Sequence, residues 1–173
     1  MDAKEIISAS LNQSYGYIER ALEGLTHEDI AWQPTSECNS IAFILWHLAQ
    51  VEDFFINRVI QRKPRIYDEG GWPEKLGTPP DESGYGYTVE QLNAWTAPKP
   101  ELLRAYASAV HESTIAYLEQ LPPEKMLELV RPDRPPDTIG SVLSRIATEI
   151  ALHAGQIDYL RGQRRGFVDT AAP

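Results

Sequence analysis

Apolar residues recur three and four positions apart through the last third of the chain, from Ile139 to Leu160. This spacing puts them on one face of a helix, and such a face must pack against other elements. The same spacing occurs in three earlier segments, and no segment alternates strands with helices. The sequence therefore predicts an all-α fold and argues against a parallel sheet.

The periodic segments predict four long helices, over residues 3–24, 39–61, 101–121 and 138–162. Their ends carry residues that start or stop helices, because Gly and Pro terminate helices and Ser, Thr and Asn cap them. Four helices of this length with one long crossover indicate a four-helix bundle. The boundary residues are Gly24, Asn39, Ser40, Pro64, Pro98, Pro100, Pro122, Pro123 and Thr138.

A long insert separates the second and third long helices, at residues 63–87, and it lacks helical periodicity. A loop of this length inside a compact domain is often a lid or a binding loop. The insert, with Trp72, Tyr85 and Tyr87, could cover a site, and a plain surface connection is an equal alternative. After the insert, Thr88 and Gln91 form a capping box for a short helix. A Pro-rich turn, residues 130–137, precedes the last helix.

The composition limits the possible partners. The chain has 173 residues with 42% hydrophobic and 24% charged, which suits one globular domain, residues 1–173. Its net charge of -9 argues against nucleic acid, which binds basic patches. No apolar run is long enough for a membrane span and no signal peptide is evident, so we expect a cytoplasmic protein. The single cysteine, Cys38, excludes an intramolecular disulfide and a Cys-rich zinc site.

Glu149 and His153 lie four residues apart within the apolar face of the last helix. Side chains at this spacing are one turn apart on the same side, so both can reach one point. Burying a carboxylate is costly unless it is paired or bound to a cation. We therefore expect a divalent metal ion there, with His47 of the second helix as the third ligand.

Two imidazoles and one carboxylate leave coordination positions open for water or substrate, as in catalytic zinc and non-haem iron or nickel sites. The alternative is a buried hydrogen bond between Glu149 and His153 without a metal, and the spacing fits both. His27 lies in a capping turn, and His111 points outward or into a groove, so neither is expected to be a ligand. Arg104 and Tyr106 fit solvated and core positions better than substrate contacts.

Three segments resemble the DinB-like (DinB/YfiT-like) superfamily of metalloenzyme-type proteins. NSIAFILWHLAQVEDFF, residues 39–55, resembles its second helix, with the metal-binding histidine at the position of His47. EIALHAGQIDYLRG, residues 149–162, resembles its C-terminal motif, and LTHEDIAWQP, residues 25–34, its lead-in segment. Many members carry His where this chain has Glu149. The His-Glu-His set is similar to the mycothiol-dependent maleylpyruvate isomerase branch.

The resemblance implies a four-helix bundle in up-down-down-up order, one divalent metal held by His47, Glu149 and His153, and a homodimer. Zinc is the first expectation, with nickel, iron or manganese as alternatives. Characterised relatives are transferases or isomerases that use low-molecular-weight thiols, and a thiol coordinated to a cation is deprotonated. The resemblance thus implies a thiol S-transferase acting on an electrophilic small molecule.

Two other functions remain open. A metal-dependent hydrolase would use metal-bound water and would need no thiol. A stress-related binding or interaction protein would have a structural metal or none, and no catalytic turnover. An open coordination position would separate the two enzyme hypotheses from the third.

Overall fold

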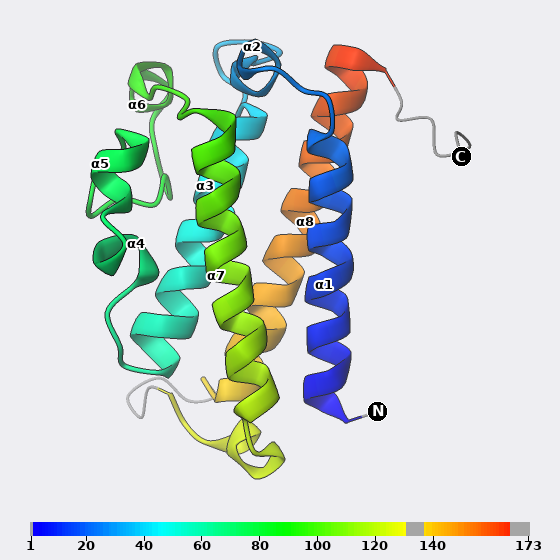
Figure 1. Ribbon diagram of the computed structural model, residues 1–173, viewed down its shortest axis with the longest axis vertical. Coiled ribbons are helices and arrows are strands. Elements are labelled where there is room, and N and C mark those ends of the chain that lie inside the picture. Colours follow the sequence, from blue (N-terminus) through cyan, green and yellow to red (C-terminus); the bar gives the residue numbers. More distant parts are fainter. Residues whose placement is uncertain (1, 131–136, 167–173) are drawn as a thin grey trace.

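The computed structural model describes residues 2–130 and 137–166. Its long helices are α1 (Ala3–Leu22), α3 (Ile41–Asp53), α7 (Pro100–Gln120) and α8 (Ile139–Arg165). Figure 1 shows α1 and α8 running upward and α3 and α7 running downward, which confirms the up-down-down-up bundle. The described residues contain no β-strand, only an isolated bridge between Leu129 and Thr138. The all-α prediction is therefore confirmed.

The helix ends follow the capping residues of the sequence. Thr26, Thr88 and Thr138 each accept a hydrogen bond from the backbone three residues later, which supplies a partner for a free N–H of the first turn. They begin α2 (His27–Ala31), α6 (Val89–Ala94) and α8. Gly24 adopts the left-handed conformation just after α1, with φ of 70°. The first helix ends two residues before the predicted boundary, and the last continues three residues beyond it.

The second long helix changes its winding after Asp53. Residues Phe54–Ile60 form a π-helix, η1, which carries the helix almost to the predicted end at residue 61. The backbone N–H of Gln61 bonds to the carbonyl of Ile56, five residues back, at 3.0 Å. A π-turn holds one more residue than an α-turn and is frequent at functional sites. The helix predicted over residues 39–61 is thus present over nearly its whole length, and its last seven residues, Phe54–Ile60, are π-helical.

The core lies where the four long helices meet. α1 packs along α8, and α3 lies between α7 and α8 and contacts both. Trp46, Leu45 and Leu48 of α3 are almost completely buried, as are Leu103 and Tyr106 of α7. The high apolar content of α3 follows from this central position, because a helix packed on more than one side is hydrophobic around most of its circumference.

The insert contains two short helices, α4 (Ile66–Glu69) and α5 (Trp72–Leu76), so the prediction of an entirely irregular segment was wrong. Their four or five residues are too few to show a periodic apolar face. In Figure 1 the insert lies beside α3 and the upper part of α7. Trp72 packs on Tyr106 of α7, with ring centroids 5.4 Å apart.

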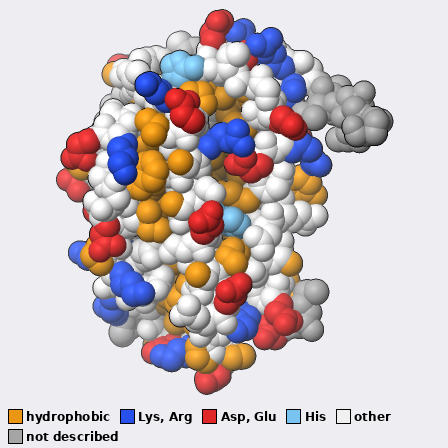
Figure 2. Space-filling model, viewed as in Figure 1, with side chains coloured by type: hydrophobic (Ala, Val, Ile, Leu, Met, Phe, Trp, Pro, Cys, Tyr) orange, Lys and Arg blue, Asp and Glu red, His pale blue; other side chains and the backbone are white. Residues whose placement is uncertain are grey.

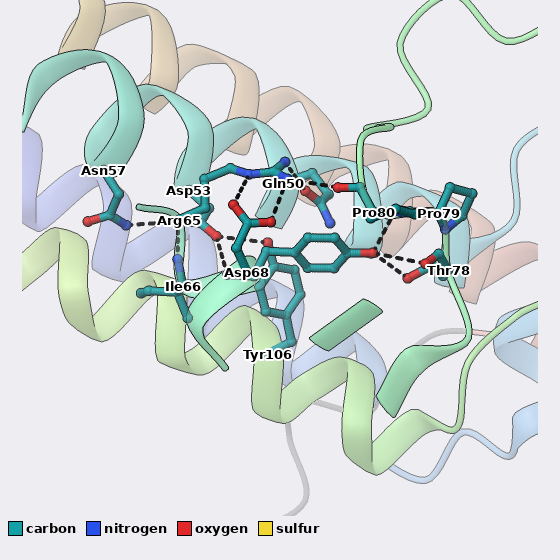
Figure 3. Close-up of polar contacts among 11 residues, drawn as sticks. Gln50, Asp53, Asn57, Arg65, Ile66, Asp68, Thr78, Pro79, Pro80 and Tyr106 are labelled. Carbon is teal, nitrogen blue, oxygen red and sulfur yellow. Dashed lines mark hydrogen bonds and ion pairs between the residues drawn. The ribbon is translucent and has the colours of Figure 1, made fainter. Parts of the chain in front are cut away.

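A buried carboxylate fixes the insert to the bundle. Asp53, at the end of α3, accepts hydrogen bonds from the backbone N–H groups of Ile66 and Tyr67 at 3.0 and 2.8 Å. Figure 3 shows these bonds beside those of Arg65, whose guanidinium pairs with Asp68 and donates to the carbonyl of Pro80. The first and last parts of the insert are thereby tied to each other and to α3.

A 3-10 helix, η2 (Pro123–Leu127), follows α7 where only a Pro-rich helix end was predicted. Most of the predicted Pro-rich turn, residues 131–136, lies outside the described residues. In the part that the structure describes, no helix is long and apolar enough to cross a membrane. Figure 2 shows acidic and basic side chains interspersed over one face, with a band of hydrophobic side chains where the insert adjoins the bundle.

Candidate functional site

A cavity of about 1000 Å³ lies between α3 with its π-helical extension, α8 and the insert. His47 lines it from α3, Glu149 and His153 line it from α8, and Ser83 and Tyr85 line it from the insert. The structure thus brings the three predicted ligands to one cavity. The insert forms one of its walls.

Glu149 and His153 are one turn apart on α8, as their spacing predicted. Nε2 of His153 lies 3.6 Å from Oε2 of Glu149, which is too long for a hydrogen bond. Nδ1 of His153 is 2.8 Å from Oε1 of Gln156, an oxygen that can only accept, so Nδ1 carries the proton. Nε2 is then the ring nitrogen left to act as a ligand atom, and it lies near the carboxylate oxygen of Glu149, which is an acceptor. Two such lone pairs near one point are suited to a shared cation.

His47 lies beside this pair. Its ring centroid is 5.3 Å from that of His153, and the two rings are nearly perpendicular. Nδ1 of His47 donates to the backbone carbonyl of Ser83 at 2.5 Å. Metal-bound histidines commonly donate their other ring N–H to a carbonyl or carboxylate, which fixes the tautomer and the ring orientation. Both histidines therefore have Nδ1 occupied and Nε2 left as the potential ligand atom.

The charge state of His47 also suits ligation. Burial lowers the pKa of His47 below its ordinary value, and the neighbouring His153 lowers it further, whereas the Ser83 carbonyl and Glu149 act in the opposite direction. A lower pKa favours the neutral imidazole, the form that binds metals. Glu149 differs from the expectation, because 46% of its side chain is exposed. The cost of burying a carboxylate therefore does not apply in full to Glu149.

These residues fit a divalent metal by donor chemistry. Two ligand atoms on one tetrahedral zinc ion lie about 3.4 Å apart, given bond lengths near 2.1 Å, and the Glu149–His153 separation of 3.6 Å is close to this. In residues 2–130 and 137–166, however, no three His, Cys, Asp or Glu side chains lie close enough together to hold an ion. As the side chains lie, the site is a pair of ligand groups with a histidine beside it.

Of the other residues that the sequence analysis considered for the site, only Tyr85 lines the cavity, and the rest lie elsewhere. Trp72 packs on Tyr106, and Tyr87 packs against Phe43. Tyr106 is fully buried, as expected for a core residue. On the surface, Arg104 pairs with Glu19. His27 is exposed, with Nε2 3.0 Å from the carbonyl of Ala97. Cys38 is partly buried, with Sγ 3.3 Å from Oγ1 of Thr35.

A second group of buried titratable side chains was missed by the sequence analysis. Glu52 is fully buried on the part of α3 that faces α1 and α7, and it accepts a hydrogen bond from the hydroxyl of Tyr15 at 2.5 Å. His111 stacks on Tyr15 at 3.8 Å and does not point outward. The available signal was the position of Glu52 four residues after Leu48 and before Ile56, on one apolar stripe.

Comparison with known proteins supports the same architecture. The chain is similar to a conserved protein of Enterococcus faecalis whose crystal structure is known, with a TM-score of 0.85 and 22% identity. The similarity covers 96% of this chain and 99% of the other, and it shows a shared fold. A comparison with curated proteins gives no match.

The sequence pattern of the DinB superfamily matches residues 10–157. This range includes α3 with His47, the whole insert, and the part of α8 that carries Glu149 and His153. The match thus covers most of the chain and all three candidate ligands. This chain belongs to the DinB superfamily.

Proposed function

We propose that this protein binds one divalent metal ion through His47, Glu149 and His153 and acts as a thiol S-transferase on small molecules. The observation that carries the proposal is the pair of acceptor atoms, Nε2 of His153 and Oε2 of Glu149, 3.6 Å apart on the wall of a large cavity. Metal binding is frequent in the superfamily. Two imidazoles and a carboxylate suit zinc, with nickel, iron or manganese as alternatives.

A divalent cation at this position would lower the pKa of a bound thiol or water. In the transfer reaction, the thiol loses its proton to solvent and its sulfur bonds to an electrophilic carbon, from which a leaving group departs with its electron pair. Neighbouring groups of the chain hold the two histidine ligands in place. His47 is oriented by the Ser83 carbonyl, and His153 is oriented by Gln156. The cavity has room for both a thiol and a second small molecule.

Metal content tests the proposal first. Protein purified without a metal-affinity tag is analysed by mass spectrometry, beside His47→Ala and Glu149→Ala. His27→Ala and Glu119→Ala are matched controls, because both residues are exposed and neither lines the cavity. We expect near one metal ion per chain in the parent and the controls, and loss in both site variants. Absence of metal in the parent, even after incubation with zinc, nickel and iron, would disprove the proposal.

Turnover then separates the enzyme classes. 1-Chloro-2,4-dinitrobenzene with L-cysteine reports thiol transfer, and p-nitrophenyl acetate without thiol reports hydrolysis. We expect the first reaction to be accelerated by the metal-loaded protein and lost in His153→Ala. Hydrolysis without thiol would instead favour the hydrolase hypothesis. A bound metal with neither activity, and with unfolding on its removal, would favour a structural metal in a binding protein. The predicted homodimer stays a prediction.

A further inference from the structure

Two aromatic side chains in the candidate cavity are exposed. Tyr85 is 88% exposed and Phe54 is 38% exposed, and both line the cavity beside His47 and His153. Phe54 packs edge to face against Phe55, and this contact restrains the orientation of the Phe54 ring. An exposed aromatic surface in a concave site gains free energy when a ligand covers it, because each such side chain can bury a large apolar area.

The backbone holds Tyr85 away from the core. Gly84 and Gly86, on either side of it, have φ of 77° and 72°, a conformation that glycine adopts readily. Gly84 lies so close to the bundle that a Cβ there would meet Cζ of Phe43 at 2.6 Å. The carbonyl of Ser83 accepts the hydrogen bond from His47. The loop that presents Tyr85 therefore contacts α3 at two consecutive residues, Ser83 and Gly84, directly before Tyr85.

The rest of the cavity wall combines apolar side chains with charged ones of both signs, and it favours an uncharged ligand over an anionic one. Val51 lies on the wall from α3, and Val142 and Ile146 lie on it from α8. Of the three arginines that line the cavity in the described part of the chain, Arg65 pairs with Asp68 and Arg145 pairs with Asp137. The third, Arg58, is exposed, and the cavity lining carries four carboxylates, those of Asp68, Asp81, Glu82 and Glu149, against these three guanidinium groups. A ligand that relied on Arg65 or Arg145 would have to break an existing ion pair.

We infer that Tyr85 and Phe54 form a binding surface for an uncharged, planar apolar compound, which they hold beside the candidate metal ligands. The inference rests on the proposed function for its chemical meaning, because it assigns the electrophilic substrate to the class of aromatic or similarly flat apolar molecules. The binding itself requires no metal. Tyr85 and Phe54 are positioning residues that set substrate preference.

Fluorescence titration with N-phenyl-1-naphthylamine tests this binding, since this uncharged aromatic dye becomes fluorescent on leaving water. We compare the parent with Tyr85→Ser and Phe54→Ser, and we use Tyr159→Ser as the matched control. Tyr159 is also exposed, at 68%, but it lies on α8 outside the cavity. We expect the Kd to rise roughly tenfold in each cavity variant, the effect of losing about 60 Å² of apolar contact, and to stay unchanged in the control.

The outcomes are distinct. Unchanged Kd in Tyr85→Ser, whose exposed side chain supports no core packing, would overturn the inference even if Phe54→Ser fails to fold. Equal weakening in Tyr159→Ser, or tighter binding of the sulfonated analogue 1-anilinonaphthalene-8-sulfonate than of the uncharged dye, would also overturn it. Metal content is measured in the same samples. Dye binding without metal would refute the proposed function alone, and metal without dye binding would refute this inference alone.

Discussion

The carboxylate of Asp53 accepts a hydrogen bond from the backbone N–H of Tyr67 at 2.8 Å, so the end of α3 directly fixes the start of the insert. The same carboxylate accepts from Asn57, from the backbone of Ile66 and from the hydroxyl of Tyr106. Asp53 is fully buried. One side chain therefore joins α3, α4 and α7 (Figure 3).

Asp53→Ala should destabilise the protein strongly. It leaves the buried backbone N–H of Tyr67, the partly buried N–H of Ile66 and the Tyr106 hydroxyl without their acceptor. An unsatisfied buried donor costs about 1–3 kcal/mol. We expect a loss of about 3 kcal/mol or more in the free energy of unfolding, measured by urea denaturation. Asp158→Ala is the control, because Asp158 is exposed on α8. A change below about 0.5 kcal/mol in Asp53→Ala, as expected for the control, would contradict this account.

Tyr15→Phe tests the second buried carboxylate. The Tyr15 hydroxyl donates to Oε2 of Glu52 at 2.5 Å. Among the described residues, Oε1 of Glu52 has no hydrogen-bond partner, and Nδ1 of His111 lies 3.9 Å from it. Removing the hydroxyl leaves the carboxylate buried without a donor. We expect a loss of about 2 kcal/mol in the free energy of unfolding, from chemical denaturation.

The adjacent Tyr17 provides the control for this change. Its side chain is 43% exposed, and its hydroxyl accepts a hydrogen bond from Gln13 on the surface of the same helix. Tyr17→Phe removes the same atom but leaves no buried carboxylate without a hydrogen-bond donor, so its effect should stay within about 0.5 kcal/mol. Equal effects of Tyr15→Phe and Tyr17→Phe would show that Glu52 does not depend on its tyrosine.

The long helices could be predicted because their signals are local. Apolar spacing and residues such as Thr138 and Pro100 act within a few positions of the chain, and the structure places helix starts at both. The π-helix after Asp53 and the short helices of the insert could not be predicted in this way. They depend on contacts between distant segments, such as the bonds from Ile66 and Tyr67 to Asp53.

The candidate site shows the same division. The spacing of Glu149 and His153 on one helix predicted that the two side chains lie together, and they do. The position of His47 beside them follows from the packing of α3 on α8. The sequence analysis expected His47 as the third ligand, and the family resemblance implied the same residue, but no local pattern placed it there. The Ser83 carbonyl that holds His47 could not be predicted, because a backbone carbonyl carries no sequence signal.

Gly84→Ala should disturb the loop that supports His47. Its Cβ would lie 2.6 Å from Cζ of Phe43 and 3.0 Å from Cζ3 of Trp46, at a φ of 77°. The left-handed conformation costs about 1–2 kcal/mol for a residue with a Cβ, and forcing atoms into a packed region costs about 1–3 kcal/mol. We expect a loss of about 3 kcal/mol on urea unfolding. If the proposed metal binds, displacement of the Ser83 carbonyl should lower its affinity about tenfold.

Gly86→Ala isolates the backbone effect. Gly86 has a similar φ, 72°, but a Cβ there would meet nothing within 4 Å. Its cost should therefore be only that of the left-handed conformation, about 1 kcal/mol. If Gly86→Ala destabilised the protein as much as Gly84→Ala, the contact with Phe43 would not be what fixes the loop.

Asp29 should make stability depend on pH in the acid range. Its carboxylate accepts from Arg165 at 2.7 Å, from Thr26 and from Arg164. The hydrogen bond from Arg165 is the largest cause that lowers the pKa of Asp29, followed by that from the Thr26 backbone. Because the folded pKa lies below the unfolded value of about 3.9, the stabilisation is present above about pH 4 and is lost as the pH falls further.

Thermal unfolding of Asp29→Asn, Arg165→Gln and the double variant checks this at neutral pH and near pH 3. At neutral pH we expect each single variant to have a lower Tm than the parent, and the double variant to lose less than the sum, because the two residues interact. Near pH 3 the difference in Tm between Asp29→Asn and the parent should shrink. At this pH the Asp29 carboxylate of the unfolded chain binds a proton, and the stabilisation from its lower pKa in the folded state decreases. A difference that stayed constant between the two pH values would show that Asp29 acts by capping α2 through Thr26 and not by its charge.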